Sequence, residues 1–341
     1  MYIETFMYII LNNMDTITIP SLIDIHVHVR EPGHEHKEDY DSLMKAAYQS
    51  GITTICAMPN TNPALTDIES YHLINNIAKK ASEKHKVDYF LYQAATDPPS
   101  PILNFPNICG IKMYLNCTTG NLKISNIDSI EYYFKSEETK NKPIMCHAEI
   151  DILPTVLEFS HKYKQYTHIC HVARKSEMEL IKQAKKINPY LTCEVSPHHL
   201  LLTKRDDKLY NVKPELQTIE DINYLWDNLD LIDCIATDHA PHLYSEKVNN
   251  ICYGFTGVET LLPLMLYQVK IGRLTMDRLI ELTHTNPIKI LKLSPDYAKN
   301  SHIVIKNPLT AKESKYKENT YSKSKWSPFV DHYVIENPVV L

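Results

Sequence analysis

The alternation of short apolar strands with amphipathic helices constrains the fold of this chain most. Eight runs rich in β-branched and aromatic residues follow one another, at 22–29, 52–58, 87–95, 108–115, 143–147, 166–172, 191–195 and 234–237. Between most of them, apolar residues recur at helical spacing, at 40–50, 68–82, 127–134, 152–161, 175–186 and 219–229. A proline-rich loop joins the third and fourth runs instead. Strands that alternate with helices predict a parallel sheet.

Eight such strands in a chain of 341 residues predict a closed (β/α)8 barrel, the TIM barrel of the α/β class. An open, doubly wound sheet is the alternative, but no G-x-G-x-x-G sequence follows any of the runs. We expect the barrel to cover residues 20–300, with its last helices at 257–272, 275–282 and 284–293. Residues 1–19 and 301–341, which include Trp326-Ser327-Pro328-Phe329, are expected to form a small β-rich annex.

Composition narrows the class of partner. Lys and Arg number 36 against 41 Asp and Glu, and a net charge of −5 is too small to indicate binding to nucleic acid or to a membrane surface. The longest apolar run near the start is too short to span a bilayer and has no basic flank. Most of the eight cysteines lie in strand-like runs and none forms a C-x-x-C pair, which is typical of free thiols. We therefore expect a cytoplasmic protein.

Metal-binding residue types gather at the predicted strand ends. They are His26 and His28 after the first strand, Lys112 in the fourth, His147 in the fifth, His171 in the sixth and Asp238 after the eighth. His26 and His28 are two apart and should face the same side of the strand, as should Arg30. The carboxyl ends of barrel strands meet at one mouth. A lone histidine is usually a hydrogen-bonded core residue. Four histidines, a lysine and an aspartate that gather at one mouth instead indicate a metal site.

Lys112 is the unusual member of this set. An ammonium group repels cations, so the simplest reading of Lys112 is a salt bridge. If carbon dioxide carboxylates the amine, the resulting carbamate offers two oxygens that can bridge two metals, and burial favours the neutral amine that this reaction needs. Two cations would lower the pKa of a bridging water and polarise a carbonyl, which is how hydrolases use paired metals.

Eight motifs resemble those of the dihydroorotases of the amidohydrolase superfamily. They are DIHVHVREPG (24–33), MPNTNP (58–63), GIKMYLN (110–116), CHAE (146–149), THICHVARKSE (167–177), TCEVSPHHL (192–200), IATDHAPH (235–242) and GFTGVETLLPL (254–264). The resemblance runs from about residue 21 to residue 329. It is strongest to the dihydroorotase domain of the animal multifunctional pyrimidine-synthesis proteins.

The resemblance implies two Zn²⁺ ions, bridged by carboxylated Lys112 and a hydroxide. One ion would be held by His26, His28 and Asp238 and the other by His147 and His171. It also implies that Arg30, Asn60 and His242 bind the substrate carboxylate. The family reaction is the reversible cyclisation of N-carbamoyl-L-aspartate to L-dihydroorotate in pyrimidine (UMP) synthesis. In hydrolysis the hydroxide would attack the ring carbonyl, and Asp238 would act as general base and then general acid. Ring closure consumes a proton, so lower pH should favour synthesis.

Three positions depart from the family pattern. Lys213 stands where animal relatives have Arg before Pro-Glu-Leu, and it keeps the charge but loses the bidentate fork of a substrate contact. Thr256 replaces the proline of the relatives' G-F-P-G motif. In the segment 116–119, which aligns with a loop that closes over substrate, Thr118 matches and is expected to contact substrate, whereas Thr119 replaces an aromatic residue.

Other functions remain open on the sequence alone. A hydantoinase, dihydropyrimidinase or allantoinase would share the metal ligands, but its neutral substrate ring has no carboxylate for Arg30 to bind. An inactive scaffold that assembles a transcarbamoylase would be expected to lose metal ligands, and this chain has all of them. We expect a homodimer with a small-molecule substrate, possible association with aspartate transcarbamoylase, and no binding to nucleic acid or membrane.

Overall fold

The computed structural model describes residues 16–118, 120–306, 313–335 and 339–340. Eight parallel strands stand side by side in chain order, from β2 to β9. They are β2 (Leu22–Val27), β3 (Ile52–Ala57), β4 (Asp88–Ala94), β5 (Ile108–Tyr114), β6 (Ile144–His147), β7 (Thr167–Ile169), β8 (Leu191–Val195) and β9 (Cys234–Ile235). The predicted TIM barrel is confirmed.

The first and last strands meet at the mouth of the barrel. Val27 forms a parallel bridge with His239, and the backbone N–H of His28 donates to the carbonyl of His239 at 2.7 Å. Beside this bridge, the Asp24 carboxylate accepts the hydroxyl of Thr237 at 2.5 Å and its backbone N–H at 3.1 Å. These contacts join β2 to the segment after β9 at the end where the metal-binding residue types lie.

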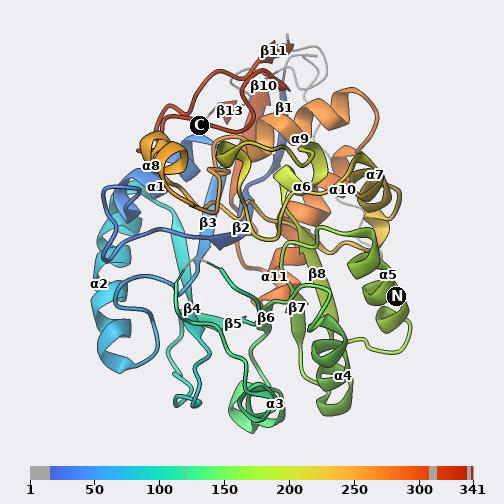
Figure 1. Ribbon diagram of the computed structural model, residues 1–341. Helices are drawn as coiled ribbons and strands as arrows, with labels where there is room; N and C mark the ends of the chain where they lie inside the picture. The colour runs from blue at the N-terminus through green and yellow to red at the C-terminus, as the bar shows by residue number, and fades with distance from the viewer. Residues whose placement is uncertain (1–15, 119, 307–312, 336–338, 341) are drawn as a thin grey trace.

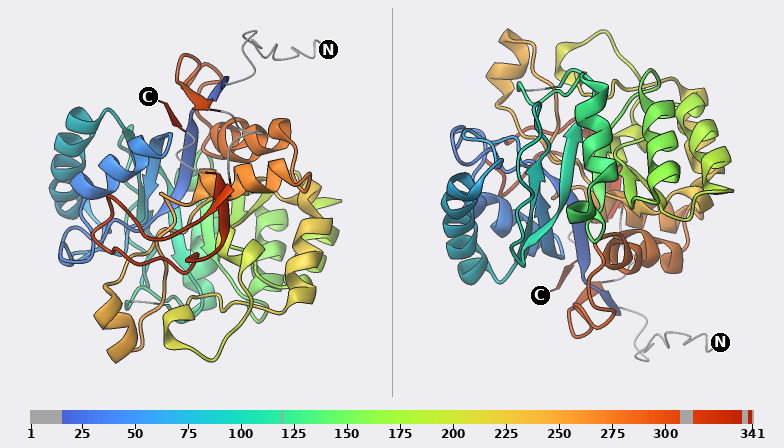
Figure 2. Two further views of the ribbon diagram at one scale, coloured as in Figure 1. Left: turned by 90° about the horizontal axis from the view of Figure 1, so that it is seen from above. Right: turned by 90° about the horizontal axis from the view of Figure 1, so that it is seen from below.

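Helices cover the outside of the strands (Figures 1 and 2). They are α1 (Tyr40–Gln49), α2 (Ile68–His85), α3 (Ile127–Lys135), α4 (Leu153–Tyr163), α5 (Lys175–Lys185), α6 (Pro197–Leu201) and α7 (Ile219–Asp227), with short 3₁₀ turns at Glu137–Thr139, Lys208–Tyr210 and Leu229–Leu231. Asp39 and Asp67 begin α1 and α2 by accepting a backbone N–H from the first turn. The connection between β4 and β5 contains no helix, as its prolines predict.

The segments after β9 differ from the prediction. They form α8 (Tyr244–Asn249), α9 (Leu261–Lys270), α10 (Met276–Ile280) and α11 (Asn286–Ile290). The helix predicted from residue 257 begins at Leu261, and the N–H groups of Gly257 and Val258, which precede it, donate to the His239 ring. The helices predicted at 275–282 and 284–293 are joined by a π-helical turn, Glu281–Thr285.

The two ends of the described chain lie together beside the barrel (Figure 1). Strand β1 (Thr16–Pro20) pairs antiparallel with β10 (His302–Lys306), which pairs with β13 (Val339–Val340). A second pair consists of β11 (Glu313–Lys315) and β12 (Tyr333–Ile335). Residues 1–15 of the predicted annex lie outside the described residues, and the domain boundaries at 20 and 300 stay a prediction.

Apolar side chains fill both sides of the strand ring. The larger cluster packs between the strands and the surrounding helices, and a smaller one fills the barrel interior with residues such as Ile23, Ile25, Cys56 and Met145. The side chains packed inside the barrel support the polar residues at its mouth. In the part of the chain that the structure describes, no helix is both long enough and apolar enough to cross a membrane.

Candidate active site

A cavity opens at the carboxyl ends of the barrel strands. It has the place in the fold at which barrel enzymes bind small molecules. Ten residues singled out from the sequence line it: His26, His28, Arg30, Asn60, Lys112, Thr118, His147, His171, Lys213 and Asp238. His242 is not among the lining residues and lies behind Arg30.

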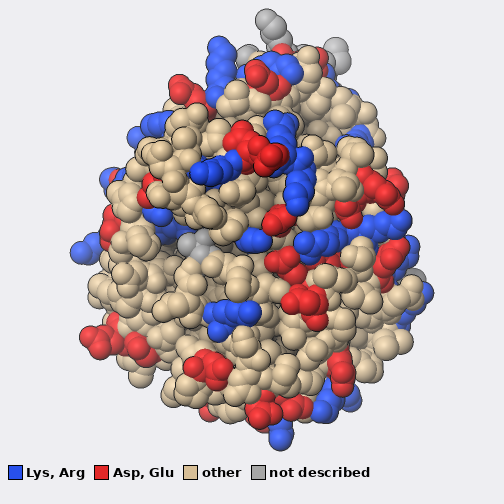
Figure 3. Space-filling model, in the orientation of Figure 1, with Lys and Arg blue, Asp and Glu red and all other residues tan. Residues whose placement is uncertain are grey.

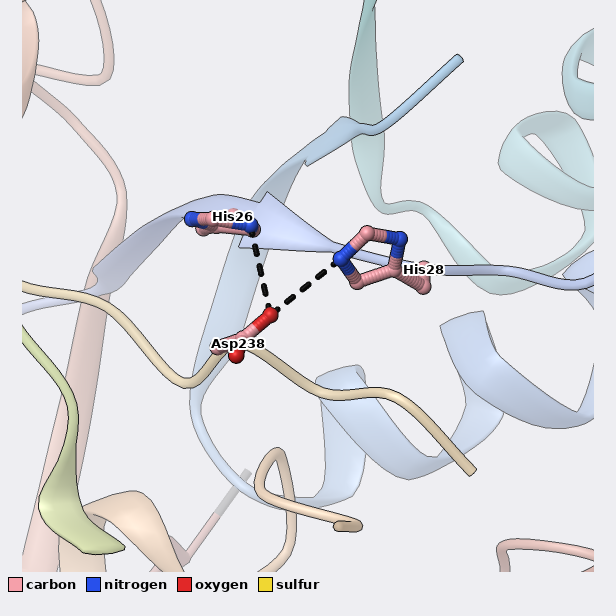
Figure 4. A group of neighbouring side chains, drawn as sticks. All are labelled: His26, His28 and Asp238. Carbon is pink, nitrogen blue, oxygen red and sulfur yellow. Dashed lines mark ion pairs between the residues drawn. The ribbon is translucent and has the colours of Figure 1, made fainter. Parts of the chain in front are cut away.

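His26, His28 and Asp238 converge on one point of this cavity (Figure 4). The Nε2 atoms of His26 and His28 lie 3.3 and 3.2 Å from Asp238 Oδ1, and ligand atoms of all three residues lie within 4.8 Å of one another. Strand β2 ends at Val27, so His28 belongs to the following loop. The expectation that strand alternation orients Arg30 is wrong, because its φ of 74° turns the backbone into the left-handed region.

The remaining ring nitrogens of the two histidines are held by buried polar groups. His26 Nδ1 contacts the carboxylate of Glu194 on β8, and His28 Nδ1 lies 2.6 Å from the side-chain oxygen of Asn60. Such partners fix the orientation of an imidazole and leave its other nitrogen available as a ligand. Asn60 therefore has a contact with His28 as well as a place in the cavity wall.

His147 and His171 form a second pair. His147 Nδ1 lies 2.9 Å from His171 Nε2, and both rings are buried. The other nitrogens, His147 Nε2 and His171 Nδ1, make no hydrogen bond with any residue that the structure describes. Burial lowers the pKa of both imidazoles and lowers that of His28 to about 4, so these rings are neutral near pH 7. Neutral imidazole is the form that binds metals.

Asp238 keeps its negative charge despite its burial. Burial alone would raise the pKa of the carboxyl, but the nearby His26 ring and the hydrogen bond with His28 hold it well below its ordinary value. The backbone of Asp238 has a φ of 47°, three residues beyond the end of β9. The site thus combines neutral imidazoles with an ionised carboxylate.

Lys112 is fully buried in the middle of the cavity floor. Its Nζ donates to the Cys170 thiol at 3.1 Å and lies 5.2 Å from the centre of the Tyr114 ring. No carboxylate of the described residues lies within ion-pair distance of it, so the salt bridge that the sequence left open is not present there. A buried lysine without an anionic partner is costly as a cation.

These residues fit a cation-binding site. Three buried ring nitrogens, His26 Nε2, His147 Nε2 and His171 Nδ1, have no hydrogen bond within the described part of the chain, as expected of nitrogens that bind a ligand. The donor set of imidazoles and a carboxylate suits zinc. A further group of ligand atoms within 4.8 Å of one another comes from His26, Cys170 and Glu194.

Arg30 provides the positive charge of the site. It is 6% exposed, and its Nε donates to the carbonyl of Pro241 at 3.1 Å, while Nη2 lies 3.1 Å from His242 Nε2. Burial lowers the pKa of the guanidinium to about 10, so it remains charged near pH 7. Among the residues that the structure describes, no carboxylate forms an ion pair with it. A buried guanidinium in this state is suited to an anionic ligand.

Lys213 and Thr118 lie at the edge of the cavity. Lys213 Nζ is 3.2 Å from Glu215 Oε1 and 5.2 Å from the centre of the Tyr253 ring, so part of its charge is already neutralised by a protein carboxylate. Thr119, which follows Thr118, lies outside the described residues.

Five lining residues were missed by sequence reasoning: Tyr114, Val212, Ala240, Tyr253 and Gly254. The Tyr114 hydroxyl is buried without a hydrogen-bond partner. Tyr114 follows Lys112 by two positions in β5, so strand alternation could have placed it on the same face. The other four belong to irregular segments, for which the sequence carries no such signal.

Comparisons with known proteins identify relatives of this chain. A family model described as Dihydro-orotase-like matches residues 15–96. The multifunctional protein CAD of Squalus acanthias is 41% identical over 92% of this chain, and the chain spans 14% of that protein. The dihydroorotase of Methanosphaera stadtmanae is 33% identical over 92% of this chain and 81% of that enzyme.

Solved structures give the same fold. The L-hydantoinase from Arthrobacter aurescens matches with a TM-score of 0.80 at 22% sequence identity, over 93% of this chain and 82% of that one. With a dihydroorotase 33% identical over four-fifths of its own length, the comparisons confirm the resemblance that the motifs carry. The chain belongs to the dihydroorotase family.

Proposed function

We propose that this chain is a zinc-dependent dihydroorotase, which interconverts N-carbamoyl-L-aspartate and L-dihydroorotate in pyrimidine synthesis. The observation that carries the proposal is the buried guanidinium of Arg30, which has no ionic partner among the described residues and lies at a cavity lined by imidazoles and a carboxylate. Dihydroorotate differs from neutral cyclic amides by its carboxylate, which Arg30 would bind.

The metal ligands follow from the side chains that converge in the cavity. One zinc would be held by His26, His28 and Asp238, and the other by His147 and His171. The neutral Lys112 amine would add carbon dioxide and release one proton, and the resulting carbamate anion would be available to both ions. When bound, the two ions would polarise the reacting carbonyl and lower the pKa of the attacking water, so that hydroxide is available near neutral pH.

Substrate would be oriented by polar groups on one wall. Arg30, Asn60 and His242 would bind its carboxylate. The His242 ring, whose Nε2 lies 3.1 Å from the guanidinium, would also hold Arg30 in place. Lys213 and Thr118 lie at the open edge, where they would contact the bound ring.

Asp238 would move the proton. In hydrolysis its carboxylate takes the proton of the attacking water and delivers it to the ring nitrogen that leaves, so it acts as general base and then as general acid. The low pKa of this carboxyl, which the surrounding imidazoles produce, keeps it in the basic form before the reaction.

Two further expectations concern assembly. We expect the chain to form a homodimer, which sedimentation of the purified protein will test. The similarity to a multifunctional protein supports an association with aspartate transcarbamoylase, which co-purification of the two enzymes will test.

A substrate comparison tests the reaction. The purified, zinc-loaded chain is assayed for ring opening of L-dihydroorotate beside dihydrouracil, hydantoin and allantoin. We expect dihydroorotate to be hydrolysed with a kcat/KM at least about a hundredfold above the neutral rings, because each of those leaves Arg30 buried without a counter-ion. Faster turnover of a neutral ring would reject the proposal.

A further inference from the structure

We propose that the C-terminal segment 319–329 is a positioning element of the active site, which holds His242 and through it the Arg30 guanidinium. The inference rests on the proposed role of Arg30 in binding the substrate carboxylate. This segment includes the Trp-Ser-Pro-Phe sequence, which lies outside the barrel and has no part in the cavity wall.

Two side chains of this segment donate to one backbone oxygen at the active site. The indole Nε1 of Trp326 donates to the carbonyl of His242 at 2.8 Å, and the Ser324 hydroxyl donates to the same oxygen at 2.7 Å. Ser324 is buried and Trp326 is half-buried. The two donors satisfy both lone pairs of that carbonyl, so the main chain at His242 is fixed from outside the barrel.

The main chain at 241–242 in turn holds Arg30. The Arg30 Nε donates to the Pro241 carbonyl, and Nη2 touches the His242 ring. The ring has contacts of its own, because Lys37 Nζ lies 3.3 Å from Nδ1 and the Tyr253 carbonyl lies 3.0 Å from Nε2. A displacement of the main chain at His242 would therefore move the guanidinium away from the position where it meets substrate.

Hydrogen bonds to the barrel and within the segment fix the position of residues 319–329. Asn319 Nδ2 donates to the Thr256 hydroxyl and to the Trp326 carbonyl, both at 2.8 Å, and the Thr256 hydroxyl lies 3.3 Å from that carbonyl. The Glu259 carboxylate accepts the backbone N–H of Ser322 at 2.8 Å. Thr256 is the residue that replaces the family's proline, and its hydroxyl is used here to hold the segment.

Lys247 joins the C-terminal segment to the loops beside the cavity. Its buried Nζ donates to the carbonyls of Asn211 at 2.6 Å and Gly254 at 3.3 Å, and it lies 5.0 and 5.7 Å from the ring centres of Phe255 and Trp326. The Trp326 indole thus packs against an amine that joins two loops bordering the cavity.

Ser324→Ala, Trp326→Phe and the double variant test the proposal in the zinc-loaded enzyme. Each single change removes one donor to the His242 carbonyl and keeps most of the packing. We expect KM for L-dihydroorotate to rise about fivefold in each single variant and further in the double, because a typical hydrogen bond is lost each time. The kcat should stay within about twofold, and the zinc content should not change. An unchanged KM in the folded Ser324→Ala variant would overturn the inference, even if Trp326→Phe fails to fold.

Two matched variants separate positioning from general destabilisation. Trp226 donates its indole N–H to the Leu200 carbonyl at 2.9 Å, and Ser160 donates to the Gln165 carbonyl at 3.1 Å, both away from the cavity. Trp226→Phe and Ser160→Ala should lower the thermal midpoint and leave KM unchanged. An equal rise in KM in these variants would contradict a positioning role.

A double-mutant cycle tests the route through Arg30. In an Arg30→Met background, Trp326→Phe should lower kcat/KM no further, because the group that it positions is gone. Fully additive losses would contradict the route. If the unmodified chain does not hydrolyse dihydroorotate, the proposed function fails; if it does and the tail variants keep a normal KM, only this inference fails.

Discussion

At Arg30 the backbone enters the left-handed region, and the side chain that follows is buried beside the carbonyl of Pro241 and the ring of His242. The Pro241 carbonyl accepts a hydrogen bond from Nε and the His242 ring lies against Nη2, but neither is an anion, so the charge of the guanidinium is not compensated. Burying this charge without an ionic partner costs free energy in the folded protein. Binding an anion at Arg30 would recover part of that cost.

Replacing Arg30 with Met should raise KM for dihydroorotate by about a hundredfold or more, since a buried charge-assisted contact is lost. Steady-state hydrolysis measures this, with zinc content as the check on the metal site. Arg278→Met is the control, because Arg278 likewise donates to main-chain carbonyls, those of Leu229 and Ile232, but on the outside of the barrel. A similar KM in Arg30→Met and in the parent would contradict the assigned role.

Lys112→Met should remove the group that we propose to bridge the two metals. We expect bound zinc to fall below two per chain and hydrolysis to drop by at least about a thousandfold, since both depend on a carbamate that methionine cannot form. Elemental analysis and the hydrolysis assay measure the two effects. Lys142→Met, which loses a contact with the Ile108 carbonyl at the other end of the strands, should keep its zinc. Full zinc and full activity in Lys112→Met would exclude the bridge.

At the scale of elements, the strands were predictable because each is a short run rich in apolar and β-branched residues, and helices separate most of them. The observed strands β3, β5, β6 and β8 agree with the prediction within one residue at either end. Their terminal geometry was less predictable. His171 and Asp238 stand two and three residues beyond their strands, with φ values of 37° and 47°. Left-handed backbone at residues other than glycine leaves no local sequence signal.

Helix α2 offers a test of an element that lies away from the cavity. The Asp67 carboxylate accepts the N–H of Ser70 at 2.8 Å as its N-cap. Asp67→Ala should cost about 1 kcal/mol and lower the thermal midpoint by about 2 °C, with KM unchanged. Asp67→Asn keeps a hydrogen-bond acceptor at the N-cap and should lower the thermal midpoint much less. A drop in midpoint of equal size in both variants would show that the cap does not act through its hydrogen bond.

At the scale of the molecule, the barrel and its mouth follow from the sequence, but the use of the C-terminal segment does not. Trp326 and His242 are more than eighty residues apart in the sequence. No periodic pattern of the sequence predicts that they are in contact. Surface charge agrees with the composition, because acidic and basic residues are interspersed on the face shown in Figure 3. The sequence therefore predicted which residues line the active site. The contacts of the C-terminal segment that hold them became visible only in the structure.

The central claim is a dihydroorotase with two functional zinc ions, and a metal titration tests it most directly. Zinc is removed from the chain with a chelator and returned in steps in bicarbonate buffer, while the rate of L-dihydroorotate hydrolysis is measured. The account predicts almost no activity in the metal-free chain and a rate that rises to a plateau at two zinc ions per chain. Full activity without metal, or a plateau at one ion, would contradict it.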